Sequence, residues 1–334
     1  MVGSVPPDAV LINANENPLG PCGEALEAMY GVIRNGGRYM FELGFELARQ
    51  IAAVEGVDPS HVRVFAGSSD PLIRSVIAFT SPTKSYVAGD PGYESGENTA
   101  RYVGAPALRV PLTKAHAHDV RAMAKADANA GLLYLCNPNN PTGTLTPRAD
   151  IEGLAANKPA GSVLLIDEAY IHFSSATPCC DLAVSGKNVV VLRTFSKLYG
   201  MAGIRAGAAI GPPELVTKIA SYGNFMLPVT AMAGAIASLK VKNLVSERRK
   251  LLADVRNEVF DFLDKQKFSF VRSESNKFML DVKQPGQQFV RAMAAEKVYV
   301  GRVWPAWPTH VRVTIGTREE MMKFRAALLK VMQA

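Results

Sequence analysis

Lys197 lies in a segment where a lysine side chain could act as a nucleophile. It follows the apolar run Val189–Leu192, which is typical of a buried strand, within Thr194-Phe-Ser-Lys-Leu-Tyr-Gly-Met-Ala-Gly203. A charged amine is costly to bury, so burial lowers the pKa of a lysine and makes its neutral form available to attack carbonyl groups. A lysine in a surface turn is the alternative. Arg205 follows eight positions later, and an arginine stays charged and matches the geometry of a phosphate group.

Asp167 has a comparable position at the end of another strand-like run. It directly follows the strongly apolar run Val163–Ile166 and precedes Glu168 and Tyr170 by one and three positions. Open α/β sheets bind ligands at the carboxyl ends of their strands. Asp167 could therefore pair with a buried cation such as a protonated pyridine nitrogen. Capping of the segment that follows is the alternative role.

Two polar loops also follow apolar runs. Asn137-Pro-Asn-Asn-Pro-Thr-Gly143 follows Leu132–Cys136, and its residue types are typical of turns that also present amide groups. Gly67-Ser-Ser-Asp70 follows Val62–Ala66 and opens a helical pattern. Its backbone N–H groups and two hydroxyls could bind a phosphate, or its Ser and Asp could cap an ordinary helix. It matches neither a Walker loop nor a GxGxxG fingerprint.

Together, these segments place a phosphate site, an amide, a carboxylate and a lysine at successive strand ends of one sheet. An enzyme that uses pyridoxal 5′-phosphate (PLP) needs a phosphate anchor, a partner for the pyridine nitrogen and a Schiff-base lysine. The combination therefore indicates a PLP site, although each segment alone has an ordinary structural explanation.

The elements that must position these side chains alternate between short apolar runs and helical patterns. Runs without polar alternation suit parallel strands that are buried on both faces. Residues 118–126 and 148–156 have the pattern of amphipathic helices between such runs. This order predicts an α/β fold with a mostly parallel central sheet that helices flank on its faces.

The pattern changes after about Tyr222, where a smaller α+β domain is expected. We expect a division into an N-terminal arm of residues 1–35 that contributes to the small domain, a large domain of 36–225 and a small domain of 226–334, with a ligand cleft between them. The elements expected in the small domain are helices 228–239 and 243–265, strands 268–271 and 277–282, helix 286–296, strand 310–315 and helix 318–332.

Composition limits the class of protein. The 334 residues are 48% hydrophobic, which is enough for a large core and more than one compact domain. The net charge of +7 indicates a mildly basic surface or a site for anions, and scattered Lys and Arg do not favour nucleic-acid binding. The four cysteines include no CxxC pair, so we expect neither a disulfide framework nor a metal site.

The expected cellular location rests on two features that the sequence lacks, a membrane span and a signal peptide. No apolar run is long enough to cross a membrane, and residues 1–9 lack the basic region and apolar core of a signal peptide. We therefore expect a cytoplasmic protein. A leader peptide that once preceded Met1 is the alternative.

The chain resembles the fold-type-I PLP-dependent aminotransferases, and within them the branch similar to histidinol-phosphate aminotransferases. The resemblance covers nearly the whole chain, and the combination of motifs in this order is specific although each motif alone is not. The motifs are Asn13-Ala-Asn-Glu-Asn-Pro18, Arg38-Tyr39, Asp90-Pro-Gly-Tyr93, Asn137 to Gly143, Asp167-Glu-Ala-Tyr170, Ser196-Lys197, Arg205 and Arg312-Val-Thr-Ile-Gly-Thr317.

The resemblance implies the fold of this family and a role for each matching residue. Lys197 would bond PLP as a Schiff base and shuttle a proton during the reaction, and Asp167 would pair with the pyridine nitrogen. Tyr170 and Asn140 would hydrogen-bond the phenolic oxygen of PLP, while Tyr93 would stack on its ring. The phosphate group would be bound by Ser68, Ser69, Ser196, Arg205 and the partner subunit's Tyr39, which implies a homodimer.

The resemblance also implies the substrate contacts. Arg312 would clamp the α-carboxylate with support from Asn15, and Arg302 lies where relatives place an arginine that meets a substrate phosphate. Trp304 and Trp307 lie beside Arg302 and suggest an aromatic wall, or else interface or core packing. An aromatic amino acid is therefore an alternative donor to histidinol phosphate.

Another departure from the family pattern concerns the segment after Tyr39. Relatives usually place a proline there, whereas this chain has Met40 and the apolar stretch that continues to Phe45. The change could alter the substrate pocket or its lid.

The leading hypothesis is an aminotransferase that moves an amino group between an amino acid or amino-alcohol phosphate and a 2-oxo acid. The same residues could support other PLP chemistry at the α-carbon, such as decarboxylation of phosphothreonine type or oxidation or cyclisation of arginine. A non-catalytic PLP-binding module is the third possibility. It is disfavoured because both Lys197 and Asp167 are present.

Overall fold

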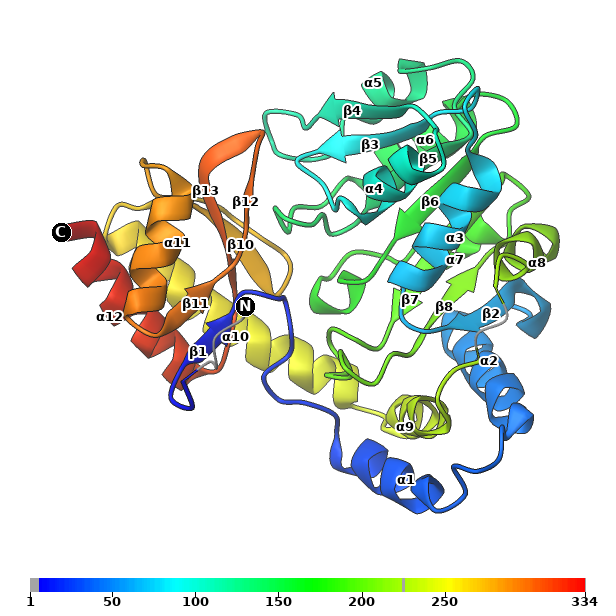
Figure 1. Ribbon diagram of the computed structural model, residues 1–334, viewed down its shortest axis with the longest axis horizontal. Coiled ribbons are helices and arrows are strands. Elements are labelled where there is room, and N and C mark those ends of the chain that lie inside the picture. Colours follow the sequence, from blue (N-terminus) through cyan, green and yellow to red (C-terminus); the bar gives the residue numbers. More distant parts are fainter. Residues whose placement is uncertain (1–5, 224–225, 334) are drawn as a thin grey trace.

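The computed structural model describes residues 6–223 and 226–333 and divides into two parts, joined by the long helix α10 (Leu244–Lys265) (Figure 1). The larger part contains a seven-stranded sheet. Five neighbouring strands are parallel, and β8 alone runs against them and against β2. The mostly parallel sheet predicted from the sequence is confirmed. In spatial order its strands are β2 (Val62–Phe65), β8 (Gly207–Ile210), β7 (Val189–Thr194), β6 (Val163–Asp167), β5 (Leu132–Cys136), β3 (Tyr86–Asp90) and β4 (Ala107–Pro111).

Both faces of this sheet are buried, which explains why its central strands carry unbroken apolar runs. Every residue of β5, β6 and β7 is buried, and alternate residues pack into two different clusters. One face is covered by α3 (Ser69–Phe79), α4 (Ser95–Tyr102) and α8 (Pro213–Ala220). The other face is covered by α2 (Phe41–Glu55), α5 (Val120–Lys125), α6 (Arg148–Asn157) and α7 (Cys180–Ala183).

The smaller part is built on an antiparallel sheet with helices on one side (Figure 1). The N-terminal arm joins it, because β1 (Val10–Ile12) pairs in parallel with β11 (Val298–Val300). The four-stranded sheet runs β12 (Val303–Trp304), β13 (Trp307–Thr314), β10 (Lys277–Asp281) and β9 (Ser269–Val271). The remaining helices of this part are α11 (Gly286–Ala295) and α12 (Arg318–Gln333).

The division into residues 1–35, 36–225 and 226–334 stays a prediction, and one packing contact bears on its second boundary. α9 (Val229–Lys240) packs against α1 (Gly23–Ile33) and α2. Its buried residues Ala231, Met232 and Ala235 belong to the hydrophobic cluster on the face of the large sheet that α2, α5, α6 and α7 cover. These contacts favour a boundary closer to α10.

Two strands of the large sheet, β8 and β4, were not predicted from the sequence. β8 reads Gly-Ala-Ala-Ile and β4 has exposed or half-buried residues at four of five positions. Neither has the strong apolar run that marks the central strands.

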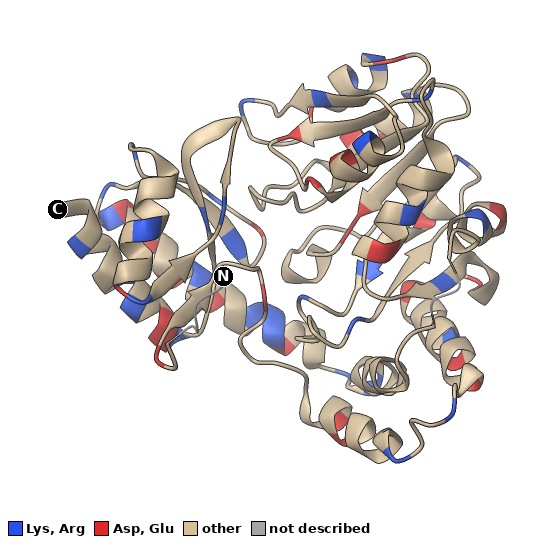
Figure 2. Ribbon diagram, in the orientation of Figure 1, with Lys and Arg blue, Asp and Glu red and all other residues tan. Residues whose placement is uncertain are grey.

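No helix within residues 6–223 and 226–333 is long and apolar enough to cross a membrane. Lys and Arg are spread over both parts of the molecule, interspersed with Asp and Glu (Figure 2).

Candidate active site

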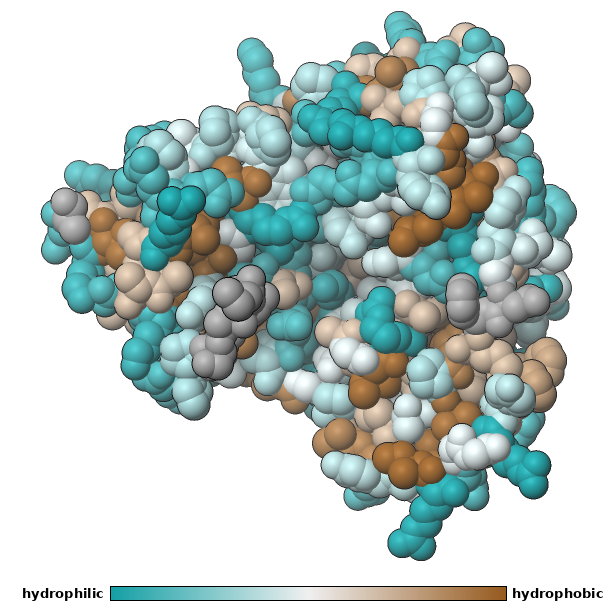
Figure 3. Space-filling model, viewed as in Figure 1, coloured by the Kyte–Doolittle hydropathy of each residue, from teal (hydrophilic) through white to brown (hydrophobic). Residues whose placement is uncertain are grey.

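A cavity of about 380 Å³ lies where the central strands end and the two parts of the molecule meet. The last residues of β5, β6 and β7, which are Cys136, Asp167 and Thr194, line its floor. Figure 3 shows the hollow between the two parts, with mostly hydrophilic walls. The cavity brings together these sequence-predicted residues: Asn15, Ser68, Ser69, Tyr93, Asn140, Asp167, Tyr170, Ser196, Lys197, Arg205, Arg302 and Arg312.

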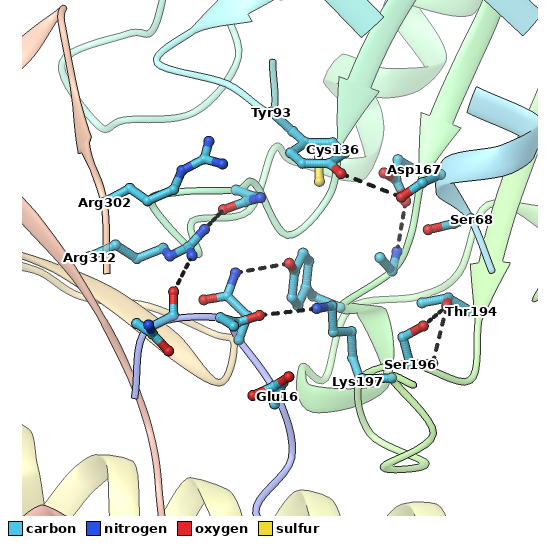
Figure 4. Close-up of a pocket in the computed structure, with 18 of the residues that line it drawn as sticks. Glu16, Ser68, Tyr93, Cys136, Asp167, Thr194, Ser196, Lys197, Arg302 and Arg312 are labelled. Carbon is cyan, nitrogen blue, oxygen red and sulfur yellow. Dashed lines mark hydrogen bonds between the residues drawn. The ribbon is translucent and has the colours of Figure 1, made fainter. Parts of the chain in front are cut away.

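Lys197 enters the cavity from the loop that connects β7 to β8 (Figure 4). Its side chain is half-buried, and its Nζ donates to the carbonyl oxygen of Ala14 at 3.4 Å. Burial and the nearby Arg312 guanidinium lower the pKa of the Lys197 amine to about 8. A substantial fraction of the amine is therefore neutral at slightly alkaline pH, as a nucleophile for carbonyl groups requires.

Asp167 presents a buried carboxylate to the cavity from the end of β6. Tyr134 Oη donates to its Oδ2 at 2.8 Å, and the backbone N–H of Ala169 donates to its Oδ1 at 3.1 Å. Burial raises the pKa of Asp167 to about 6, against the effect of these hydrogen bonds. Within the described residues no cation forms an ion pair with it. A protonated ring nitrogen placed here would supply the missing countercharge, so the residue fits PLP.

Gly67, Ser68 and Arg205 form a compact anion site at the amino terminus of α3. Arg205 Nη1 donates to Ser196 Oγ at 2.9 Å, and Nη2 donates to the Ala66 carbonyl oxygen at 3.0 Å. A Cβ atom at Gly67 would lie only 2.3 Å from Arg205 Nη2, and Gly67 has a φ of +82°, so glycine is required here on two counts. A fixed guanidinium beside hydroxyls and a helix amino terminus suits the phosphate of PLP.

Tyr93, Tyr170, Asn15 and Asn140 lie around the centre of the cavity. Tyr93 Oη is 3.4 Å from Ser69 Oγ. Asn15 Nδ2 donates to Tyr170 Oη at 3.0 Å, whereas Asn140 Oδ1 accepts from Arg312. The sequence interpretation assigned Asn140 to the Tyr170 side and Asn15 to the Arg312 side. The observed partners are exchanged, and the roles of both asparagines stay predictions.

Arg312 projects from β13 into the cavity and is buried. Its Nη1 donates to Asn140 Oδ1 at 2.9 Å and its Nη2 to the carbonyl oxygen of Asn13 at 2.7 Å, while its buried Nε has no hydrogen-bond partner among the described residues. Burial lowers the pKa of Arg312 to about 10. A buried guanidinium without a carboxylate partner in the described part of the chain is well suited to bind an anionic group of a ligand.

Arg302 lies beside Arg312 on the same wall but is exposed. It forms an ion pair with Glu94, and its Cζ lies 4.9 Å from the ring centre of Trp304. Trp304 is buried and its Nε1 donates to the Gly92 carbonyl oxygen at 2.8 Å, whereas Trp307 packs against His116 and His310. Neither tryptophan is among the residues that line the cavity, which favours packing, the alternative role considered for them.

Tyr39 does not reach the cavity of its own chain. Its exposed fraction is 70%, and it precedes α2 on the outer surface of the large part. Its contact with a partner subunit stays a prediction.

Several residues near the cavity were missed by the sequence interpretation. Tyr134 lies within the expected strand 132–136, where a polar group that faces the Asp167 carboxylate could have been noticed. Lys277 is fully buried, with its Nζ 2.8 Å from Ser275 Oγ and 3.1 Å from the ring centre of Tyr170. Burial keeps the pKa of Lys277 well below its usual value. A lysine at the start of the apolar run that forms β10 was the available signal.

Comparison with known proteins matches residues 8–328 to the family described as aminotransferase class I and II. The aromatic amino acid aminotransferase of Cutibacterium acnes is 33% identical over 318 residues, covering 94% of this chain and 90% of that protein. The histidinol-phosphate aminotransferase of Moorella thermoacetica is 29% identical and covers 97% of this chain and 86% of its own. A solved structure of histidinol-phosphate aminotransferase from Sinorhizobium meliloti, in complex with pyridoxal-5′-phosphate, has a TM-score of 0.90 at 24% identity and covers 97% and 91% of the two chains.

Proposed function

The chain belongs to the aminotransferase class I and II family and is a PLP-dependent transaminase of the histidinol-phosphate aminotransferase-like branch; from this premise we propose its substrates and the work of its residues. Its donor is an amino acid or amino-alcohol phosphate of the aromatic or histidinol-phosphate type, and its acceptor is a 2-oxo acid. The observation that carries this proposal is the buried Arg312, which lines the same cavity as Lys197 and has no carboxylate partner among the described residues.

The cofactor-binding residues divide by the part of PLP that each would hold. Arg205, Ser68, Ser69 and Ser196 would bind the phosphate, which suits the guanidinium and hydroxyls gathered at the start of α3. Asp167 would hold the proton of the ring nitrogen. The remaining contacts of the ring would come from Tyr93 on its face and from Tyr170 and Asn140 at its phenolic oxygen.

When bound, PLP supplies a carbonyl carbon that takes up the donor's amine and a ring that delocalises the electron pair released at the α-carbon. Lys197 would bond that carbonyl carbon before the donor arrives, and its freed Nζ would then carry the proton from the donor's α-carbon. Its lowered pKa supports both uses, because the neutral amine is nucleophilic and basic. Arg312 would bind the donor's α-carboxylate and so orient the α-carbon toward Lys197.

A donor panel tests the amino transfer directly. The PLP-loaded protein is titrated with phenylalanine, tyrosine, histidinol phosphate, glutamate and arginine while its visible absorbance is followed. We expect one of the first three to abolish the band of bound PLP stoichiometrically and a 2-oxo acid to restore it. A band that no donor changes, or that turnover changes without return by any 2-oxo acid, would contradict the proposal.

We also propose a homodimer in which the partner subunit's Tyr39 reaches the phosphate site. Support comes from large apolar side chains that stay exposed on α1 and α2 of the single chain. Figure 3 shows hydrophobic patches over this region. The exposed side chains include Tyr30 at 72%, Ile33 at 55%, Phe41 at 59% and Phe45 at 68%. An exposed patch of this kind typically marks a protein interface.

Mixing one impaired and one inactive variant tests whether Tyr39 acts across subunits. Tyr39→Ala is expected to lower activity on the order of tenfold, because a hydrogen bond to a charged group is lost. Mixed with Lys197→Ala after partial unfolding and refolding, it should recover to about a quarter of wild-type activity, since half of the dimers would be hybrids with one complete site. Mixed subunits no more active than the variants alone would show that Tyr39 does not complete the partner's site.

A further inference from the structure

We propose that Glu94 makes the cavity selective for donors with a singly charged carboxylate on the α-carbon over donors with a doubly charged phosphate ester. This inference deepens the proposed function and rests on it. It concerns the wall that carries Arg302 and Arg312, which meets the anionic end of the donor.

Two guanidinium groups on this wall lie close to the same buried indole. The Cζ atoms of Arg302 and Arg312 lie 4.9 Å and 5.4 Å from the ring centre of Trp304, and both arginines line the cavity. Two cations without a countercharge would suit a phosphate ester, which carries a charge of about −1.5 to −2 near neutral pH. The two arginines alone would therefore carry enough positive charge to bind either a carboxylate or a phosphate ester.

Glu94 cancels one of the two positive charges. Its carboxylate pairs with Arg302 and leaves Arg312 without an acidic partner among the described residues. Both neighbours affect the pKa of Arg312: the charge of Arg302 lowers it, and the charge of Glu94 raises it. The three groups together carry one net positive charge, which matches one carboxylate.

A hydrogen bond of the Trp304 indole helps to hold Glu94 and Arg302 in this arrangement. Trp304 Nε1 donates to the Gly92 carbonyl oxygen at 2.8 Å. This bond joins the loop that carries Glu94 to the loop that carries Arg302, each two residues from a bonded group. Glu94 thus stays beside Arg302 because of this hydrogen bond between the loops as well as the ion pair.

The other acidic side chains near the cavity are placed elsewhere. Glu16 lies on the side of Lys197, and Asp167 lies at the far end of the cavity (Figure 4). Glu97, one turn further along the same segment as Glu94, pairs with Arg101 and Arg109. Glu94 does not line the cavity itself, but among the described residues it is the carboxylate paired with an arginine of this wall, so its charge would repel a second negative charge on the donor.

The solvent exposure of the Arg302–Glu94 ion pair means that it affects ligand selectivity more than stability. The Arg302 and Glu94 side chains are 50% and 33% exposed, so the pair itself adds little to stability. Selectivity, however, depends on the difference between two ligands, and an unfavourable charge contact with one of them is enough to create it. A dianion would have to approach Glu94 or displace it from Arg302, whereas a carboxylate can bind Arg312 and leave the pair intact.

Binding of two unreactive ligands that share one aromatic arm tests this inference. Calorimetry on the PLP-loaded protein measures Kd for 3-phenylpropionate and for 2-phenylethyl phosphate. We expect the wild type to bind the carboxylate more tightly. Glu94→Gln, which removes the charge and keeps the shape, should tighten phosphate binding on the order of tenfold and change carboxylate binding by less than about threefold.

Glu97→Gln is the matched control, since it removes one acidic charge that has arginine partners of its own. It should leave the ratio of the two Kd values near that of the wild type. An unchanged ratio in Glu94→Gln, an equal change in Glu97→Gln, a wild type that prefers the phosphate or one that binds neither ligand would each overturn the inference. These outcomes are separate from the donor panel: transfer without a shift in the ratio rejects the role of Glu94 alone, and a shift without transfer rejects the proposed function.

Discussion

Amino transfer is expected to fall on the order of a thousandfold or more when Lys197 is replaced by alanine, because the variant lacks both the nucleophile and the proton carrier. Lys197 lines the cavity, and its pKa of about 8 keeps part of its amine neutral at slightly alkaline pH. Initial rates with the best donor measure the loss. Borohydride reduction followed by peptide mapping shows whether PLP was bonded to a lysine at all.

Lys277 provides the control for this experiment, because it is a second buried lysine close to the cavity. In Lys277→Met, PLP should still be trapped on Lys197, whereas Lys197→Ala should trap none. Trapping of PLP on Lys277 in the wild type, or ordinary turnover in Lys197→Ala, would move the attachment site away from the loop between β7 and β8.

Arg312→Ala is expected to weaken donor binding by about 2–5 kcal/mol, because it leaves the donor's anionic group buried without its countercharge. The side chain is buried and its Nε lacks a hydrogen-bond partner among the described residues, so a bound anion would find an unused donor there. The Michaelis constant of each donor should rise steeply, and kcat should change less. The measurement is a full kinetic comparison with the wild type across the donor panel.

Arg302→Ala is the comparison for Arg312, since it removes a guanidinium from the same wall. Its side chain is half exposed and already paired with Glu94, so we expect an effect on a carboxylate donor of less than about 1 kcal/mol. Michaelis constants that stay unchanged in Arg312→Ala for every donor would remove Arg312 from the substrate site.

The sequence was most informative about residues at the ends of apolar strands. Asp167 and Lys197 could be located because parallel strands buried on both faces leave unbroken apolar runs, and the chemistry follows directly after those runs. The resemblance then extended the site to Arg312 and Asn15. All of these line one cavity.

The contacts between distant segments could not be predicted in the same way. Tyr134 donates to Asp167 from a neighbouring strand, and Glu94 pairs with Arg302 across the two parts of the molecule. Such partners depend on register and on domain packing, which no local pattern encodes. β8 escaped for a local reason, since four small or aliphatic residues in a row give little periodicity.

The pairing of β1 with β11 has a consequence for the order in which the molecule can be completed. The arm that holds β1 continues directly into Asn13 and Asn15, which line the cavity. The strand that anchors this arm, however, follows every strand of the large sheet in the sequence and leaves the ribosome after them. During synthesis, β1 therefore cannot pair until β11 has been made, as is usual for contacts between residues far apart in the chain. A ribosome-bound chain that has finished the large sheet would carry Lys197 and Asp167 and still lack one wall of the cavity.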